Sequence, residues 1–123
     1  MDTAEALDCA IAAHARWKYR LMEAIETGRS SWHVGDVRAD HACDFGKWLL
    51  TLPLSHRLSR HCKEVKRLHA EFHGLAADVL ELALAGRKDE AAAAIALGSR
   101  FATVSSSLTM AVIAWQEDPA ESA

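Results

Sequence analysis

The sequence lacks the features that mark a secreted, membrane-spanning or nucleic-acid-binding protein. Its first residues carry no positive flank followed by an apolar run, and its longest apolar stretches are shorter than a membrane span. Its formal net charge is -3 with histidines neutral, so there is no basic surplus for a nucleic acid or an anionic membrane. We therefore expect a cytoplasmic protein without membrane insertion, whose partners are proteins or small ligands.

Cysteine and tyrosine are also scarce. The three cysteines, Cys9, Cys43 and Cys62, are odd in number and widely spaced, which does not suit a disulfide framework. In a reducing compartment such residues are free thiols or metal ligands. Histidine is abundant by contrast, because the chain has seven histidines against one tyrosine. That surplus needs an explanation at each position.

The length of 123 residues suits one domain over residues 1–123. A chain of this size buries a sizeable core without disulfides, so size alone does not require a structural metal. Residues 1–2 and the tail 117–123, which contains Pro119, are predicted to be frayed ends.

The N-terminal part is predicted to be one helix followed by a loop. Apolar residues recur at helical intervals from Thr3 to about Thr27, and Gly28 is placed as a C-terminal stop. The next segment, 29–39, contains Ser, Gly and Asp without a clean period and is predicted to be a connecting loop.

A short helix and two long helices are predicted for the rest of the chain. Asp40 is placed as the N-cap of a helix over 41–50, which Pro53 closes. A third helix is predicted over 54–85 and a fourth over 88–115.

In both long predicted helices, the apolar residues on one face begin in the first half of the helix. The first stripe includes Leu58 and Cys62, and the second begins at Leu97. Together with the first helix, these elements predict an all-α fold, an antiparallel four-helix bundle in which one helix is short.

Three histidines fall on the apolar faces of these helices. Residues seven apart lie within about 20° of each other on a helical wheel, so His14 shares the stripe of Leu7 and Leu21. By the same rule His69 lies on the apolar line of its helix, with His73 one turn beyond. Burial of an unpaired polar group costs roughly 1–3 kcal/mol, so these imidazoles need hydrogen-bond partners or a metal ion.

The short helix supplies a fourth candidate. Its sequence from Cys43 to Trp48 is CDFGKW, and Gly46 holds a mid-helix position where glycine costs roughly 1 kcal/mol relative to alanine. Such a glycine usually marks the close approach of another group. Phe45 and Trp48 give the helix an apolar side. Cys43 is placed in its first turn, where the helix dipole favours a thiolate.

Three imidazoles and one thiolate form a set that tetrahedral zinc accepts, at about 2.0–2.1 Å for nitrogen and about 2.3 Å for sulfur. Magnesium and calcium prefer oxygen ligands, so copper is the main competitor. The predicted metal ligands are His14, Cys43, His69 and His73.

This pattern resembles the chemoreceptor zinc-binding (CZB) domain. The motifs that carry the resemblance are His14-Ala-Arg-Trp17-Lys18, Cys43-Asp-Phe45-Gly46-Lys-Trp48 and His69-x-x-Phe72-His73. The similarity extends over the four predicted helices. It implies an all-helical domain that binds one Zn²⁺ through the four predicted ligands, usually as a homodimer. The residues expected to pack around the site are Trp17, Phe45, Gly46, Trp48 and Phe72.

The resemblance also implies a regulatory role. Such domains are typically attached to bacterial chemoreceptors or diguanylate cyclases, where zinc, or oxidation of the zinc-bound cysteine, controls the output. The sequence contains no methyl-accepting coiled coil and no cyclase segment. We therefore expect either a stand-alone member that acts through a signalling partner or a piece of a longer protein.

The number of ligands bears on function. Four protein ligands close a zinc site, whereas catalytic zinc keeps one position for water or substrate, so we expect no enzyme activity. Because the ligands must be deprotonated, zinc affinity is expected to fall as pH drops through the histidine range. Oxidation of Cys43 to a sulfenic acid is expected to weaken its hold on zinc.

Three alternatives stay open at this point. A purely structural zinc protein would have the same ligands. A small zinc hydrolase would need one of the four to be absent from the metal. A di-iron or oxygen-carrying bundle would need inward Glu-x-x-His motifs, and Glu71 between the two histidines is predicted to point elsewhere.

The remaining candidates are predicted to lie outside the site. His41 is expected on the surface, and His33 has no assigned role. His56 and His61 precede His69 by two or more turns, and at 1.5 Å per residue His61 is about 12 Å away along the helix.

Two cysteines and a run of charges are predicted to have no part in metal binding. Cys9 and Cys62 are expected to be buried, as small apolar residues. The charged residues between Arg57 and Arg67 are expected to form a solvated helix face, with a docking surface as the alternative.

Overall fold

The structure, a computed structural model, describes residues 2–118. All regular elements in this range are helical, which confirms the predicted all-α fold. The elements are α1 (Thr3–Thr27), α2 (Val34–Arg38), the 3₁₀ helix η1 (Asp40–Ala42), α3 (Asp44–Thr51), α4 (Leu54–Arg57), α5 (Arg60–Leu84), α6 (Lys88–Ile95) and α7 (Arg100–Gln116). Of the expected frayed ends, residues 1 and 119–123 lie outside the described residues.

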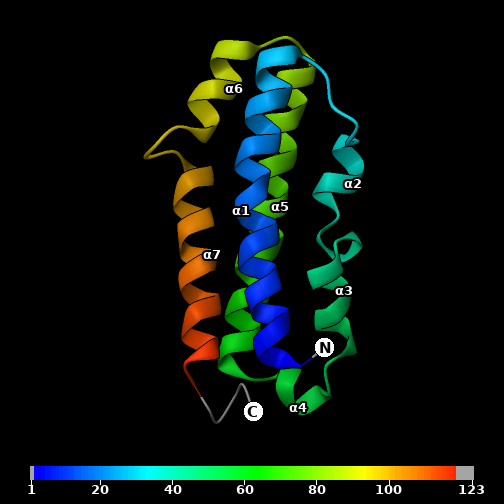
Figure 1. Cartoon of the computed structure of the whole chain (residues 1–123), viewed down its shortest axis with the longest axis vertical. Coiled ribbons are helices and arrows are strands. Elements are labelled where there is room, and N and C mark those ends of the chain that lie inside the picture. Colours follow the sequence, from blue (N-terminus) through cyan, green and yellow to red (C-terminus); the bar gives the residue numbers. More distant parts are fainter. Residues whose placement is uncertain (1, 119–123) are drawn as a thin grey trace.

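Consecutive parts of the bundle run in opposite directions (Figure 1). After α1, residues 34–51 return along the bundle as α2, η1 and α3, here called the α2–α3 segment. Helix α5 then runs parallel to α1, and α6 with α7 returns on the other side of these two helices. Helix α5 is central, since it contacts α1, α2, α6 and α7. The predicted bundle is confirmed, with the broken α2–α3 segment in the place of one helix.

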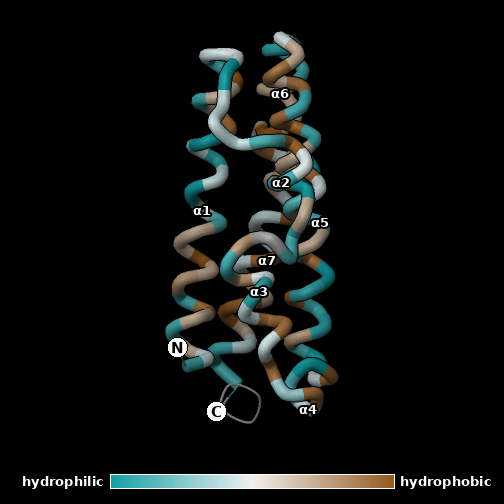
Figure 2. Tube along the Cα trace, turned by 90° about the vertical axis from the view of Figure 1, so that its right-hand side faces the viewer, coloured by the Kyte–Doolittle hydropathy of each residue, from teal (hydrophilic) through white to brown (hydrophobic). Residues whose placement is uncertain are grey.

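Apolar side chains fill the space between the helices. In Figure 2 the hydrophobic stretches of the chain gather in the interior and hydrophilic turns face outward. Helix α7 contributes an uninterrupted row of buried apolar residues, Phe101, Val104, Leu108, Val112 and Trp115, here called the α7 side. Full burial of each such side chain stabilises the fold by about 1.5–3 kcal/mol.

The first helix begins and ends as predicted. Asp2 caps its start, because its carboxylate accepts a hydrogen bond from the backbone N–H of Glu5 at 2.8 Å. Gly28 ends it with φ of 72°, a left-handed conformation that L side chains rarely adopt.

The two long helices predicted for the second half of the chain are each interrupted. The third is divided at Ser59, whose hydroxyl accepts the backbone N–H of Cys62 and starts α5. The fourth is divided at Gly98, with φ of 88°, followed by Ser99 as the N-cap of α7. The serine caps satisfy N–H groups that a helix start leaves without partners, so each break costs little.

The α2–α3 segment differs from its prediction in two respects. Residues 34–38 form a short helix where a loop was predicted, and its Val37 is buried against the bundle. Asp40 starts η1 and does not cap the next helix. The N-cap of α3 is Cys43, whose sulfur accepts the N–H of Gly46 at 3.3 Å. Burial of Val37 stabilises this short helix through tertiary packing, which the periodicity of a polar stretch does not reveal.

Three apolar residues expected in the interior are exposed. Leu58 lies at the break between α4 and α5, and Leu97 lies in the connection before α7 with 102% relative exposure. Cys9 is also exposed, whereas Cys62 is buried as predicted. The helix breaks turn the two leucines away from the stripes on which an unbroken helix would have placed them.

Among the described residues, none of the helices combines the length and the apolar character that a bilayer crossing requires.

Candidate metal centre

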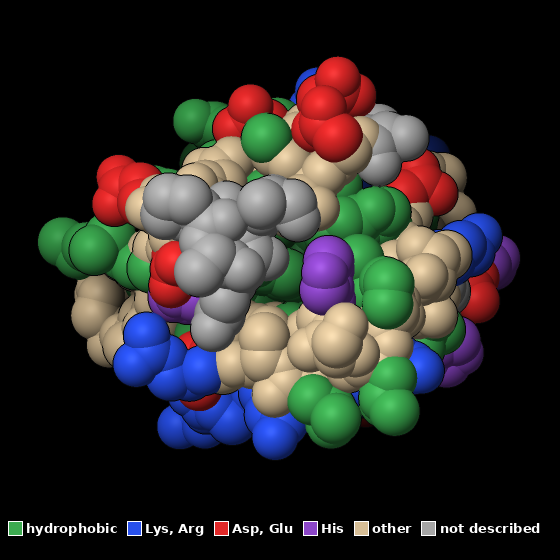
Figure 3. All heavy atoms as spheres, turned by 90° about the horizontal axis from the view of Figure 1, so that it is seen from below, with side chains coloured by type: hydrophobic (Ala, Val, Ile, Leu, Met, Phe, Trp, Pro, Cys, Tyr) green, Lys and Arg blue, Asp and Glu red, His purple; other side chains and the backbone are tan. Residues whose placement is uncertain are grey.

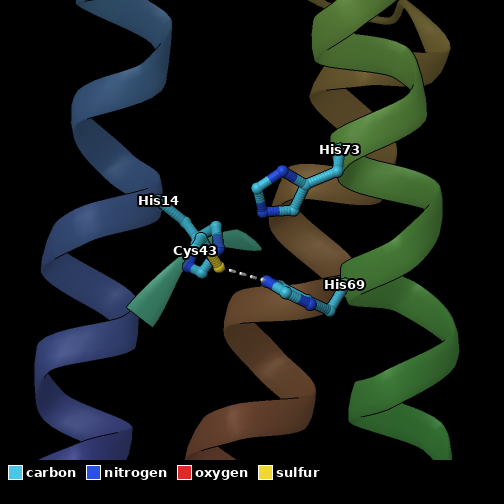
Figure 4. A group of neighbouring side chains, drawn as sticks. All are labelled: His14, Cys43, His69 and His73. Atoms are coloured by element: carbon cyan, nitrogen blue, oxygen red, sulfur yellow. Dashed lines mark hydrogen bonds between the residues drawn. The ribbon is translucent and has the colours of Figure 1, made fainter. Parts of the chain in front are cut away.

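Four side chains from three elements meet in the middle of the bundle (Figure 4). His14 comes from α1, His69 and His73 from α5, and Cys43 from the start of α3. One possible ligand atom from each residue lies within 4.8 Å of all the others. In tetrahedral zinc sites neighbouring ligand atoms are roughly 3–4 Å apart, so the four atoms are already gathered close to that spacing. The structure therefore brings together all four predicted ligands.

Two of the imidazoles are oriented by backbone carbonyls. Nδ1 of His14 donates to the carbonyl oxygen of Ala10 at 2.7 Å, and Nδ1 of His73 donates to that of Val37 at 2.8 Å. A carbonyl only accepts, so Nδ1 carries the proton in both rings and Nε2 keeps its lone pair. In His73 this Nε2 is buried and has no hydrogen-bond partner. Both rings thus present Nε2 as a donor for a metal.

The third imidazole, His69, is held differently. Its Nε2 lies 3.2 Å from the sulfur of Cys43, which Figure 4 marks with a dashed line. Its Nδ1 is buried without a hydrogen-bond partner, and the nearest recorded charged atom is a carboxylate oxygen of Asp40 at 3.8 Å. An unpaired buried polar atom costs roughly 1–3 kcal/mol.

Burial lowers the pKa of all three histidines. The pKa of His14 falls to about 4, mainly by desolvation and against the effect of its hydrogen bond to Ala10. That of His69 falls to about 2, again by desolvation and then by the neighbouring imidazoles. The pKa of His73 is lowered too, again mainly by desolvation. The imidazoles are therefore neutral near pH 7, and proton competition for them begins at a lower pH than the ordinary histidine range that the sequence suggested.

Burial acts on Cys43 in the opposite sense. Desolvation raises the pKa of this half-buried thiol, and the negative charges of Asp40 and Asp44 raise it further. The backbone N–H groups of Gly46 and Phe45 lower it, but by less. The expected preference for a thiolate at the helix start is therefore not found in the metal-free protein. A metal ion that binds this sulfur must displace its proton.

Aromatic rings enclose the cluster. Phe45 lies edge-on to His14 and His69, with ring centroids 5.9 and 5.2 Å apart, and Phe72 lies edge-on to His14 at 5.2 Å. Trp48 stacks on Phe45 at 5.7 Å and so packs one layer outside. These contacts place Phe45, Phe72 and Trp48 around the site as the sequence suggested.

The role of Gly46 is steric. A Cβ at this position would overlap the backbone carbonyl oxygen of Asp40. The close approach predicted from a mid-helix glycine is therefore present, and it fixes η1 against the first turn of α3.

Trp17 is buried on α1 and pairs with Trp32, with ring centroids 5.0 Å apart and the Arg20 guanidinium over both rings.

The other histidines and acids lie outside the cluster. His41 is exposed, and His61 faces Asp118 at 3.1 Å near the end of the bundle. Glu71 points away, toward ion pairs with Arg67 and Arg100. The sequence did not predict that Asp40 lies next to His69. The two are brought together by the 3₁₀ helix η1, which contains Asp40 and leaves no periodic pattern in the sequence.

The donor set and its surroundings fit zinc. The cluster offers three neutral imidazoles and one sulfur and contains no carboxylate ligand, and one of its ligand atoms, Nε2 of His73, is buried without a partner. The protein is thus a helical bundle with a buried site of the kind that holds a metal ion.

The family model of the chemoreceptor zinc-binding domain matches residues 14–80, from the first of these histidines to the last turns of α5. The chain belongs to this family of zinc-binding regulatory domains. Comparisons with curated proteins and with solved structures find no match.

Proposed function

We propose that the protein is a zinc-dependent sensory domain in which zinc is bound by His14, Cys43, His69 and His73. Occupancy of the site, or oxidation of its cysteine, controls a signalling partner of the chemotaxis or cyclic-di-GMP type. The observation that carries this proposal is the convergence of the four ligand atoms within 4.8 Å in the bundle interior. Zinc would neutralise the buried polarity of the cluster and join α1, α3 and α5.

The site provides a response to zinc itself. Metal that binds only the folded state adds RT ln(1 + [L]/Kd) to stability, about 2.7 kcal/mol when free zinc is a hundred times Kd. Because Cys43 is the only ligand on the α2–α3 segment, zinc fixes this segment to α1 and α5. The position and order of the segment are what we propose the partner detects.

The cysteine provides a second input. The Cys43 thiolate, whose proton zinc binding has displaced, attacks the terminal oxygen of a hydroperoxide. The O–O bond breaks, the hydroxyl stays on sulfur, and the leaving alkoxide or hydroxide takes up a proton from water. The sulfur is oxidised by two electrons to a sulfenic acid and the peroxide is reduced by two. A sulfenic acid is a weaker zinc ligand than a thiolate, so oxidation releases the α2–α3 segment from the metal.

Native mass spectrometry of untreated, chelated and peroxide-treated protein tests both inputs. We expect one zinc per chain in untreated wild type and loss of zinc on oxidation. The Cys43→Ala variant is expected to hold less than a full equivalent at low metal, and Cys62→Ala, the matched buried cysteine, is expected to behave as wild type. Full zinc occupancy in Cys43→Ala would overturn the ligand assignment.

The same spectra separate the alternatives. A purely structural zinc protein would keep its zinc through mild oxidation and through chelators at any cellular zinc concentration. An enzyme would require an open position, and X-ray absorption is expected to show three nitrogens, one sulfur and no bound water. We also propose that the domain is a cytoplasmic homodimer. A dimer mass in the native spectrum tests the oligomeric state.

A further inference from the structure

We infer that Asp40 is a positioning residue for the metal site, whose carboxylate accepts the Nδ1 proton of His69 and so aims Nε2 of that ring at the zinc. This inference rests on the proposed ligation of zinc by His69. It assigns a role to a residue that lies three positions before the cysteine and outside the ligand set.

The three imidazoles differ in what holds their outer nitrogen. His14 and His73 donate to the backbone carbonyls of Ala10 and Val37, which no side-chain substitution removes. His69 has no such carbonyl, and its Nδ1 is one of the two buried ring nitrogens without a hydrogen-bond partner. Metal-bound histidines almost always donate their other N–H to a carboxylate, a carbonyl or water, which fixes ring and tautomer. His69 therefore needs an acceptor that the backbone does not supply.

The proton on His69 can be assigned from its other contact. Nε2 faces the sulfur of Cys43 at 3.2 Å. This nitrogen is the one that faces the other proposed ligands, so it gives its lone pair to the metal when zinc is bound. A neutral imidazole whose Nε2 binds a metal carries its own proton on Nδ1. The buried Nδ1 is therefore a donor, and it faces Asp40.

Asp40 is placed to supply the acceptor. Its Oδ2 lies 3.8 Å from Nδ1 of His69, too long for a hydrogen bond but within reach of a side-chain rotation. The His69 ring is 0% exposed, whereas the Asp40 side chain is 32% exposed and so lies between this ring and solvent. Asp40 is the one carboxylate recorded within ion-pair distance of this ring among residues 2–118. Zinc on Nε2 makes the Nδ1 proton more acidic and strengthens the interaction with a carboxylate.

The backbone of Asp40 is fixed from the opposite side. A Cβ at Gly46 would overlap the Asp40 carbonyl, so η1 and the first turn of α3 lie in direct contact. One short stretch, 40–46, thus contacts both nitrogens of a single ring, Asp40 at Nδ1 and Cys43 at Nε2. Displacement of Cys43 from the metal therefore also withdraws the group that orients His69, so two of the four ligands weaken together.

The experiment compares Asp40→Ala and Asp40→Asn with wild type in two measurements. Zinc affinity is measured by competition with a chromophoric chelator, and the ring nitrogens of zinc-loaded protein are observed by ¹H–¹⁵N NMR. We expect zinc affinity to fall by 10–100-fold in Asp40→Ala, within the range found when such outer partners are removed. We expect a smaller loss in Asp40→Asn, which keeps an acceptor oxygen. The Nδ1 signal of His69 is expected to shift and that of His14 to stay unchanged. The Asp40 charge also acts on His73, where a smaller shift than at His69 is expected.

Asp44 provides the matched control. It is an acid of the same segment that acts on the Cys43 charge as Asp40 does, but it is exposed and has no recorded contact with a ligand histidine. Asp44→Asn is expected to leave the His69 signal unchanged. An equal loss of affinity in Asp40→Asn and Asp44→Asn without a change at His69 would overturn the inference, because charge alone would then explain both. Affinity within twofold of wild type in Asp40→Ala would overturn it as well.

The controls also separate this inference from the proposed function. If wild type fails to bind one zinc, the proposed site is wrong. If wild type binds one zinc and both Asp40 variants bind it equally well, only the role of Asp40 is wrong. Circular dichroism and thermal melts of the metal-free variants show whether either fails to fold, and Asp40→Asn, which preserves size and shape, then carries the test.

Discussion

The α2–α3 segment and the α7 side both lie against α1 and α5, but they are held there by different chemistry (Figure 1). On the α7 side the buried residues are apolar, and Trp115 and Leu108 are almost completely covered. On the other side the contacts include three buried imidazoles and a half-buried thiol. Two of these ring nitrogens have no partner.

This difference has a thermodynamic consequence. Apolar burial stabilises the α7 side at any metal concentration, whereas the cluster is penalised until an ion satisfies it. The packing of α7 against α1 and α5 is therefore expected to persist without zinc, and the packing of the α2–α3 segment to depend on it. A sensor needs such a division, because the element that responds must be less stable than the frame that holds it.

The largest expected effect separates the two sides. In His69→Leu, zinc affinity should fall by more than 100-fold, because a ligand is lost, while the metal-free protein should be at least as stable as wild type. The reason is that leucine removes a buried nitrogen without a partner. Chelator competition and urea unfolding of the metal-free protein measure the two quantities.

Leu108→Ala is the matched change on the α7 side. It should lower the free energy of unfolding by about 2–5 kcal/mol with and without zinc, because it leaves a cavity in an apolar core. Its zinc affinity should stay that of wild type. A large loss of zinc affinity in this variant would show that the two sides are not independent.

The second prediction concerns acid. The pKa values of His14, His69 and His73 are lowered in the folded state, so above pH 6.5 they are neutral in both states and their full contribution is present. As pH falls below 6.5, the unfolded chain binds protons on these histidines that the folded protein does not bind. The metal-free protein should then lose roughly 1 kcal/mol per pH unit for His14, down to about pH 4, and a similar amount for His69. His73 should add to the loss in the same direction.

Urea unfolding of metal-free protein at pH 7, 6 and 5 measures this slope. Replacement of His73 by leucine should reduce this slope, whereas replacement of the exposed His41 by glutamine serves as the surface control. Equal slopes in wild type and His73→Leu would contradict the assignment of the acid sensitivity to the cluster.

The third prediction tests the contact inside the α2–α3 segment. Gly46→Ala should destabilise the protein by about 1–3 kcal/mol, because its Cβ overlaps the Asp40 carbonyl, and it should also weaken zinc binding. Gly74→Ala, on α5 with open space around it, should stabilise by up to about 1 kcal/mol through helix propensity. Thermal melts with and without zinc compare the two. Equal effects of both substitutions would rule out the steric role of Gly46.

The smallest effect is expected at the surface. Arg38 joins α2 to α5 through ion pairs with Asp78 at 2.9 Å and Glu81 at 3.5 Å, all of them partly exposed. Arg38→Ala should cost no more than about 1 kcal/mol, and the loss should shrink at high salt. Hydrogen exchange of α2 should rise while that of α7 stays constant. A cost above 2 kcal/mol would show that this ion pair, and not zinc, is the main attachment of the segment.

The sequence by itself determined the class of fold and the ligands to propose. Apolar residues at helical spacing defined α1 and α5, and the same spacing placed His14, His69 and His73 on inward faces. The mid-helix position of Gly46 indicated a close approach, which the structure shows to be the carbonyl of Asp40. These features depend on local periodicity and propensity, which a single chain segment records.

Only the tertiary structure decided what surrounds each ligand. The helix breaks at Ser59 and Ser99 are by contrast local caps, which the apolar periodicity concealed. The outer partners of the histidines come from elsewhere in the fold, Val37 for His73 and Asp40 for His69. The protonation of Cys43 was also decided by its burial rather than by its place at a helix start. Burial and contacts between distant residues are properties of the packed bundle, so no spacing along the chain could have specified them.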